Sequence, residues 1–271
     1  MNELVKPARP FNQPVSLIGK ATFAGICALE RAVRRHSKVG IGPFFAEQQF
    51  PWVPAVKARW RDVHAEAVRL LAERERLPAF QDISTEVGYI TQDRQWKTFM
   101  LVGYGLRSQR GLGYCPAAAA LLRQIPGLRT AFFSILEPGK RIPPHRGPYN
   151  GVLRLHLGLV VPTDAKQCWI RVDGERRSWR PGEVLIFDDA LTHEVHNDTR
   201  EIRVVLFVDF LRPCRWPVSW INRSTVFLAR FSPLVQSARR RTQAWEHGFF
   251  ARGPANGPRD SAPAEVGGRV K

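Results

Sequence analysis

Residues 152–161 read VLRLHLGLVV, a stretch in which every second residue from 153 to 159 is leucine. Successive side chains of a β-strand point to opposite faces, so the leucines would share one face, with Arg154 and His156 on the other. The stretch therefore predicts a strand whose leucine face lies in a core. The opposite face is either solvated or buried, and a buried arginine beside a histidine would need an anionic partner.

The same period of two returns in four other segments. Residues 201–210 alternate aliphatic side chains with a second set, which is Arg203, Val205, Phe207 and Asp209. An arginine at the start of an apolar strand is either an exposed end or a cation that binds a buried carboxylate. Further strands are predicted at residues 130–136, 168–172 and 183–187, separated by turn signals such as Pro181-Gly182.

Helical periodicity precedes and follows these strands. Apolar residues spaced by three and four predict an amphipathic helix over residues 54–76, and Pro116 begins a second helix that ends by Pro126. Residues from Trp216 onward are helical in pattern again. Strands at short spacing between helices predict an α+β fold. Its core is an antiparallel sandwich or a double-stranded β-helix, the jelly-roll architecture of cupins, buttressed by helices.

Four regions are expected along the 271 residues, a length that suits one large domain with arms. Residues 1–45 form a basic N-terminal extension with an amphipathic helix, and residues 46–215 form the domain. Residues 216–250 form a basic amphipathic helical segment. Residues 251–271 are rich in Gly, Pro, Ala and charged residues, and this composition predicts disorder.

The composition excludes a disordered chain, because 44% of the residues are apolar and 24% are charged. The net charge of +17 favours anionic partners, which include nucleic acid, phospholipid headgroups and acidic substrates, without choosing among them. The ends hold more than half of this excess. Residues 1–39 have seven basic and two acidic side chains, and residues 230–271 have eight basic and three acidic ones.

The cysteines and the apolar segments bear on the compartment. Cys27, Cys115, Cys168 and Cys214 form no CxxC pair, which argues against a structural zinc site or a disulfide scaffold. The most apolar early stretch, residues 17–29, is too short to span a bilayer. We therefore expect a cytoplasmic protein, peripheral at the inner face of the membrane.

Two histidines stand just outside predicted strands. His145 lies in PHRGPYN, residues 144–150, and His193 begins HEV, shortly after FDD at residues 187–189. Alone, two loop histidines are more often polar surface residues than metal ligands. They belong, however, to an ordered set of Ser134, His145, Arg154, His156, the FDD motif, His193 and Arg203. Over about residues 50–215 this set resembles the aspartyl/asparaginyl β-hydroxylase family.

That family comprises Fe(II)- and 2-oxoglutarate-dependent dioxygenases, among them vertebrate aspartate β-hydroxylase and the bacterial hydroxylases of lipid A and ornithine lipids. The resemblance implies a double-stranded β-helix in which His145 and His193 bind Fe(II). It also implies a reaction with O2 in which 2-oxoglutarate is converted to succinate and CO2 while an unactivated C–H bond is hydroxylated. Neutral imidazoles suit Fe(II), which fits these two residue types.

The resemblance assigns the 2-oxoglutarate site as well. Arg154 and His156 match the residues that meet the C1 carboxylate end of the cosubstrate. Ser134 and Arg203 match those that hold its C5 carboxylate. A guanidinium group forms bidentate, charge-assisted hydrogen bonds to a carboxylate that would otherwise be costly to bury, so the residue types make chemical sense.

One position departs from the wider superfamily. A carboxylate ligand usually follows the first histidine by two residues, and this chain has Gly147 there, as vertebrate aspartate β-hydroxylase does and lipid A hydroxylases do not. Iron would then be held by two histidines, 2-oxoglutarate and water. Asp188 or Asp189 either orients a ligand beside the metal or merely turns the chain after a strand.

Three functions remain open from the residues. The first is hydroxylation of a fatty acyl chain of a membrane lipid, of the ornithine-lipid or lipid A type. Residues 220–241 favour it, because an apolar face beside five arginines is typical of a helix at an anionic membrane surface, although such a helix could also pack across the barrel. The second is hydroxylation of Asp or Asn in a peptide or small metabolite. The third, an inactive basic protein that binds membrane or nucleic acid, is disfavoured because all six matched residues are present.

Overall fold

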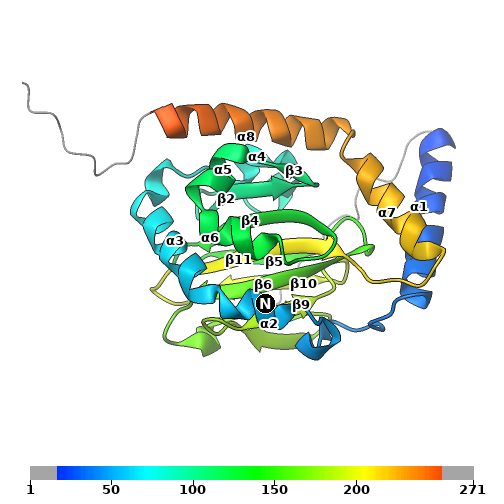
Figure 1. The fold of residues 1–271 in the computed structure, drawn as a ribbon, viewed down its shortest axis with the longest axis horizontal. Helices are drawn as coiled ribbons and strands as arrows, with labels where there is room; N and C mark the ends of the chain where they lie inside the picture. Colours follow the sequence, from blue (N-terminus) through cyan, green and yellow to red (C-terminus); the bar gives the residue numbers. More distant parts are fainter. Residues whose placement is uncertain (1–16, 252–271) are drawn as a thin grey trace, which may run out of the picture.

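The computed structural model describes residues 17–251, with side chains from residue 24 onward, as two antiparallel β-sheets surrounded by helices (Figure 1). The larger sheet has seven strands in the order β1 (Phe44–Phe45), β9 (Val184–Phe187), β6 (Val152–Val160), β11 (Arg203–Leu211), β4 (Leu128–Leu136), β2 (Trp96–Gly103) and β3 (Leu106–Arg107). The smaller has the order β5 (Arg141–His145), β10 (His193–Asn197), β7 (Cys168–Val172) and β8 (Glu175–Ser178). The α+β fold class with a jelly-roll core is confirmed.

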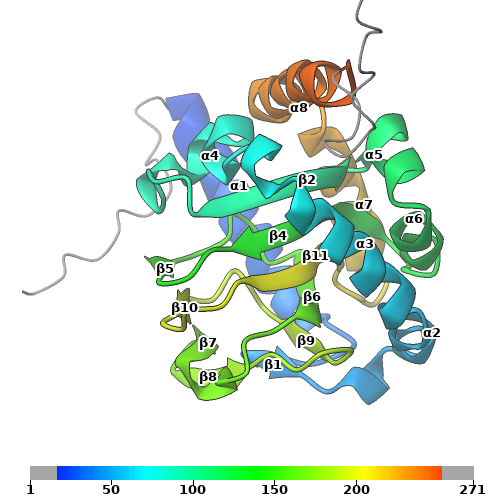
Figure 2. The ribbon, with the colours of Figure 1, turned by 90° about the vertical axis from the view of Figure 1, so that its left-hand side faces the viewer.

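The helices lie on three sides of the barrel. One group, α2 (Val53–Ala58), α3 (Trp60–Ala72) and α6 (Pro116–Leu122), packs together, and α3 lies on β6 (Figure 2). Next to them α5 (Gln109–Tyr114) contacts β2, as do α4 (Phe80–Ile83) and the long α8 (Pro233–Ala251). At one end α1 (Leu17–Arg35) and α7 (Val218–Ala229) lie side by side (Figure 1).

The period of two in β6 and β11 separates two cores. The leucine face of β6 is at most 1% exposed and packs with Val204, Leu206 and Val208 of β11 in the core beneath α2, α3 and α6. Burying such side chains stabilises the fold by about 1.5–3 kcal/mol each. The sequence prediction of an alternating, half-apolar strand is confirmed for both segments. Arg154, His156 and Arg203 consequently face the other way, toward the smaller sheet.

A second core fills the space between the two sheets. It joins Leu136, Phe187 and Val205 of the large sheet to Ile142, Ile170, Val172 and Val195 of the small one, with Trp96 and Trp179 beside them. These side chains surround the charged inner face of β6 and β11. This core therefore separates the polar residues at the centre of the barrel from water.

Three sequence predictions differ from the structure, and β2, which lies between β4 and β3 in the large sheet, was not predicted. The helix expected over residues 54–76 is interrupted at Arg59, between α2 and α3, and the apolar spacing conceals the break because both helices face the same core. The C-terminal helical segment divides into α7 and α8, because Pro233 begins a new helix. His145 and His193, expected in loops, are the last residue of β5 and the first of β10.

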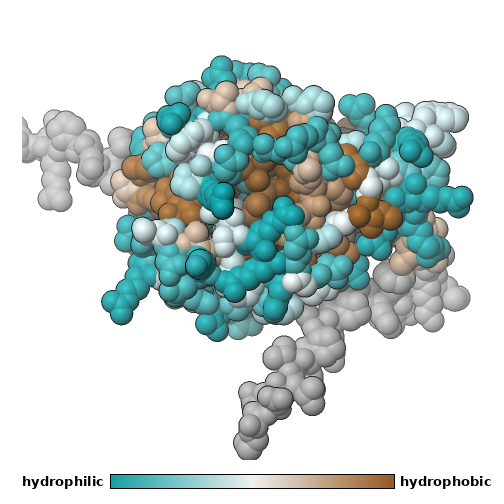
Figure 3. All heavy atoms as spheres, turned by 90° about the horizontal axis from the view of Figure 1, so that it is seen from below, coloured by the Kyte–Doolittle hydropathy of each residue, from teal (hydrophilic) through white to brown (hydrophobic). Residues whose placement is uncertain are grey.

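Two further observations concern the helices and the outer surface. No helix within residues 17–251 is both long and apolar enough to cross a bilayer. Seen from below, the molecule shows apolar side chains gathered near the centre of the face within a hydrophilic rim (Figure 3).

The disorder predicted for residues 251–271 concerns residues outside the described part of the chain, apart from Ala251 at the end of α8. Residues 1–16 also lie outside the described part.

One buried ion pair joins the end of β11 to the loop after β9. Arg212 and Asp188 are both fully buried, and the Arg212 side chain donates to Asp188 as well as to the carbonyl oxygen of Asn150 at 2.8 Å. Removing one partner of a buried pair leaves the other charge without compensation. Asp188 is thus a structural residue, since its carboxylate is held by Arg212.

We expect Asp188→Ala to lower the free energy of unfolding by about 3–5 kcal/mol, because it leaves the Arg212 guanidinium buried and unpaired. Glu175→Ala is the matched control: it breaks the Arg177–Glu175 pair, whose two side chains are 44% and 43% exposed. That pair should contribute about 1 kcal/mol or less. Denaturant unfolding measures both, and equal effects of the two substitutions would contradict the structural role of Asp188.

Candidate active site

The two histidines meet across one strand pair. β5 and β10 are antiparallel neighbours, and their register places His193 directly opposite His145. The two imidazole rings lie with their centroids 4.1 Å apart. β5 is an edge strand, so it tolerates Pro143 and Pro144 immediately before His145. A pairing of strands that are 48 residues apart in the sequence thus brings the two predicted ligands together.

Each ring is oriented by its own backbone. Nδ1 of His145 lies 2.8 Å from the carbonyl oxygen of Pro143, and Nδ1 of His193 lies 3.0 Å from that of Leu191. A proton on each Nδ1 leaves the Nε2 lone pair available. Burial lowers the pKa of His145 to about 4 and that of His193 well below its usual value. Both rings are neutral at physiological pH, the form that binds a metal.

Arg203 is a buried cation with no carboxylate partner among residues 17–251. It is 1% exposed, and its Nε has no hydrogen-bond partner among the described residues. Its Nη1 donates to the backbone oxygen of Ser134 at 3.5 Å, and its guanidinium carbon lies 4.7 Å over the Trp179 ring. Burial lowers the pKa of Arg203 to about 10. Such a group is costly to leave unpaired, so this position is suited to an anion.

His156 and Ser134 lie on β6 and β4, the two strands that flank the strand of this arginine. Both ring nitrogens of His156 are buried without a partner among residues 17–251, and the ring packs 5.0 Å from Phe187 and 5.2 Å from Phe207. Burial, with Arg203 and Arg154 nearby, lowers its pKa well below the usual value. Ser134 accepts a hydrogen bond from Trp96 Nε1 at 3.0 Å and keeps its own proton to donate.

Arg154, in contrast, already has two carboxylate partners. Asp209 lies directly opposite it in the β6–β11 register, and Arg154 Nε donates to Asp209 Oδ1 at 2.8 Å. Arg154 Nη2 also lies 2.8 Å from Asp189 Oδ2. The guanidinium carbon stacks 4.1 Å over the Phe207 ring. A carboxylate bound here would therefore share Arg154 with Asp209 and Asp189.

The Asp189 carboxylate lies where a side chain at residue 147 would begin. A Cβ atom at residue 147 would lie 2.0 Å from Asp189 Oδ2, and the Gly147 amide donates to the Asp189 backbone oxygen at 2.7 Å. Asp189 is fully buried, and burial raises its pKa to about 7. The carboxylate thus fills the space in which a side chain at residue 147 would begin. Within the described residues no third His, Cys, Asp or Glu joins the two histidines in a metal-binding group.

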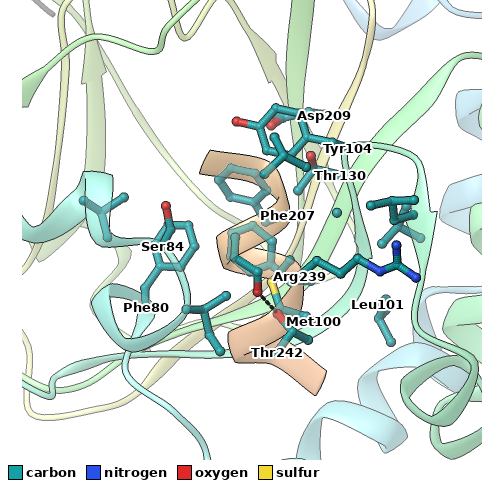
Figure 4. A pocket seen from close by; sticks show the side chains of 18 of the residues that line it. Phe80, Ser84, Met100, Leu101, Tyr104, Thr130, Phe207, Asp209, Arg239 and Thr242 are labelled. Carbon is teal, nitrogen blue, oxygen red and sulfur yellow. Dashed lines mark hydrogen bonds between the residues drawn. The ribbon is translucent and has the colours of Figure 1, made fainter. Parts of the chain in front are cut away.

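A cavity of about 650 Å³, shown in Figure 4, has His145 in its wall. His145, Gly147, Arg154 and Asp209 line its inner part. Much of its wall is apolar and comes from the barrel, α4 and α8, including Phe80, Ile90, Met100, Leu101, Phe132, Phe207 and Val235. Three exposed arginines, Arg107, Arg110 and Arg239, line it farther out. This volume is typical of a small-molecule pocket.

The six predicted site residues therefore lie around one buried centre. The sequence analysis did not identify the residues that contact them. Asp209 belongs to the alternating pattern of β11 and lies on its inner face, so the pattern contained a signal for it. Trp96 and Trp179 follow no such signal, since one lies in a strand buried on both faces and the other just after β8. Their indoles close the centre of the barrel around Ser134 and Arg203.

The fold is a jelly-roll barrel with polar residues enclosed between its two sheets, as in cupin-like proteins. The sequence comparison assigns the family within this class. Residues 57–213, more than half of the chain, match the model of the aspartyl/asparaginyl β-hydroxylase family. The chain belongs to that family. Its activity is accordingly of the hydroxylase class.

Two relatives show where in the family it lies. The chain is 44% identical over 221 residues to an ornithine lipid ester-linked acyl 2-hydroxylase from Rhizobium tropici, which covers 82% of this chain and 79% of that protein. It is 32% identical over 166 residues to human aspartyl/asparaginyl β-hydroxylase, covering 59% of this chain and 21% of the human protein. The similarity to the bacterial lipid hydroxylase thus extends over most of both chains.

We expect Gly147→Ala to destabilise the fold by about 1–3 kcal/mol, because the new methyl group would overlap the Asp189 carboxylate. Gly113→Ala is the control, since Gly113 lies in α5 with open space around it, and alanine there should be neutral or slightly stabilising. Thermal unfolding measures both. A Gly147→Ala protein as stable as Gly113→Ala would show that the overlap does not occur.

Proposed function

We propose that this chain is an Fe(II)- and 2-oxoglutarate-dependent dioxygenase that hydroxylates an unactivated C–H bond on a fatty acyl chain of a membrane lipid, of the ornithine-lipid type. The observation that carries the substrate class is the largely apolar cavity that has His145 in its wall. The extended similarity to a lipid acyl hydroxylase supports the same substrate.

His145 and His193 would hold the iron through their Nε2 atoms. Their neutral charge, their opposed register and their backbone-bound Nδ1 atoms fit a two-histidine centre. Iron(II) bound there, with 2-oxoglutarate and O2, supplies the oxidising power for hydroxylation. Asp189 is the carboxylate that faces this centre, and we assign it the orientation of a neighbouring ligand or water, whereas Asp188 is held by Arg212.

Arg203 and Ser134 would bind the C5 carboxylate of 2-oxoglutarate. The unpaired Nε of Arg203 and the free Ser134 hydroxyl proton supply two donors in a site from which water is excluded. His156 and Arg154 would meet the C1 carboxylate end, His156 through a ring N–H that has no partner in the described chain. The negative charge of the cosubstrate would thus compensate the buried charge of the Arg203 guanidinium.

The acyl chain would lie along the cavity wall. Met100, Phe132 and Phe207 provide an apolar path toward His145, and they exclude water from the reacting carbon. Arg107, Arg110 and Arg239 would meet an acidic headgroup at the outer end. Because the lipid substrate resides in a membrane, we place the enzyme at the inner surface of the cytoplasmic membrane as a peripheral protein.

One observation favours a second substrate, the side chain of Asp or Asn in a peptide. The same three arginines of the cavity would attract an acidic group, and the chain is related to human aspartyl/asparaginyl β-hydroxylase. The apolar wall fits an acyl chain better than a peptide. We therefore treat the peptide as the alternative outcome of the test.

We expect a host that makes ornithine lipids to accumulate a lipid heavier by one oxygen atom when it expresses this protein, as seen by mass spectrometry of total lipids. His193→Ala should abolish the product, because two protein ligands leave no redundancy. Met100→Trp fills the cavity and should reduce lipid hydroxylation while metal binding persists. Unchanged lipids together with a hydroxylated Asp or Asn peptide would replace the lipid by the alternative substrate.

We expect Arg203→Ala to raise the apparent KM for 2-oxoglutarate by about two to four orders of magnitude, since a buried charge pair loses roughly 3–5 kcal/mol when one partner is removed. Arg203→Lys keeps the charge but loses the bidentate geometry, so its KM should lie between those of the wild type and Arg203→Ala. Succinate formation against 2-oxoglutarate concentration measures the effect. An unchanged KM in a folded Arg203→Ala protein would show that the cosubstrate binds elsewhere.

A further inference from the structure

An exposed apolar face runs along α7 and the residues that flank it. Of ten large hydrophobic residues that are exposed in the described chain, six lie between residues 216 and 231. Trp216 is 81% exposed, Trp220 68%, and Leu228 and Phe231 63% each. Soluble surfaces carry scattered hydrophobic residues, whereas a cluster of this kind marks an interaction site.

Three arginines gather at the C-terminal half of the same helix. Arg129, from the start of β4, lines a hollow together with Arg223, Phe227 and Leu228 of α7. Arg230 lies 5.2 Å over the Phe227 ring and 5.6 Å over the Phe231 ring. The aromatic side chains thus lie among the cations on a single face.

These arginines have no counter-ion within residues 17–251. Arg129 Nε is buried without a hydrogen-bond partner, and no described carboxylate forms an ion pair with Arg129, Arg223 or Arg230. Burial, followed by repulsion from Arg223 and Arg230, lowers the pKa of Arg129. Like charges held together without an anion cost free energy, which an external anion would recover.

The combination identifies one kind of partner. Tryptophan and phenylalanine beside arginine suit the boundary between headgroups and acyl chains, where rings are buried and cations meet phosphates. Nucleic acid would satisfy the arginines but would leave Ile221 and Leu228 without an apolar partner. A second copy of the chain would bring the same three cations against their equivalents across a two-fold axis.

We propose that α7, with Trp216 and Phe231 at its ends, docks on an anionic bilayer and that Arg129, Arg223 and Arg230 bind a phospholipid phosphate. This inference rests on the proposed membrane location of the enzyme and is independent of the hydroxylation chemistry. α8, whose first turns line the cavity, begins four residues after α7 ends. Docking by α7 would therefore bring the wall of the substrate cavity toward the lipid surface.

The docking is tested with the full chain and vesicles of phosphatidylcholine alone or with phosphatidylglycerol. Wild type should co-float with the mixed vesicles only. Arg129→Gln/Arg223→Gln/Arg230→Gln should weaken this binding by about thirtyfold or more. The matched control, Arg123→Gln/Arg240→Gln/Arg241→Gln, removes the same charge from exposed positions on α6 and α8, and it should weaken binding by about threefold or less.

Trp220→Ser/Leu228→Ser tests the apolar part and should also abolish flotation at low salt. Equal losses in the two arginine triples would reduce the effect to general charge attraction and overturn the site. So would equal binding to both kinds of vesicle, or no binding at all. Conversion of a dimer to a monomer by Trp220→Ser/Leu228→Ser would show a self-interface instead, and oligonucleotide binding lost only in the α7 triple would show a nucleic-acid surface.

Hydroxylation of lipid in detergent micelles separates this inference from the proposed function. The α7 variants should keep their micellar turnover, because none of the changed residues lines the cavity or contacts the histidines. Vesicle binding without hydroxylation in the wild type would leave the docking face intact and refute the lipid substrate. Micellar hydroxylation without vesicle binding would refute the docking face alone.

Discussion

A charged inner face on β6 and β11 is the constraint on which the rest of the structure depends. The period of two puts the leucines under the helices and thereby forces Arg154, His156 and Arg203 between the sheets. Such a face is stable only if each charge has a partner or will acquire one. Arg154 has Asp209 and Asp189, while Arg203 has, among residues 17–251, a backbone oxygen and the Trp179 ring but no carboxylate. This difference makes Arg203 the cation of this face that is best suited to bind an external anion.

The absence of a side chain at residue 147 follows from the same packing. Asp189 reaches into the space where a side chain at that position would start, so the chain can hold a carboxylate there only from the loop after β9. A carboxylate from residue 147 and the present position of Asp189 exclude each other. The proposed two-histidine iron site therefore depends on the packing of the whole loop after β9, and replacing Gly147 alone would not convert it into a site with three protein ligands.

Much of this arrangement was predictable from the sequence. The alternation of residues 152–161 and 201–210 predicted both strands, their core faces and the positions of Arg154, His156 and Arg203. The strands β5 and β10 were missed because Pro143 and Pro144 argue against a strand and β10 is polar in four of its five residues. Local patterns also contain no information on which distant strands pair, so only the family resemblance implied that His145 and His193 meet, and the β5–β10 register explains how they do.

The arginines show why the net charge by itself predicted so little. A cation paired within the fold, such as Arg212 with Asp188, cancels in the net charge and attracts no external anion. Arg203 and the group of Arg129, Arg223 and Arg230 each add to the net charge, because they lack carboxylate partners in the described chain, but the total does not show that one lies inside the barrel and the others beside exposed aromatic rings. The proposed anions follow from these surroundings: a small dicarboxylate fits a sealed, indole-lined centre, whereas a phosphate flanked by acyl chains fits an open apolar helix face.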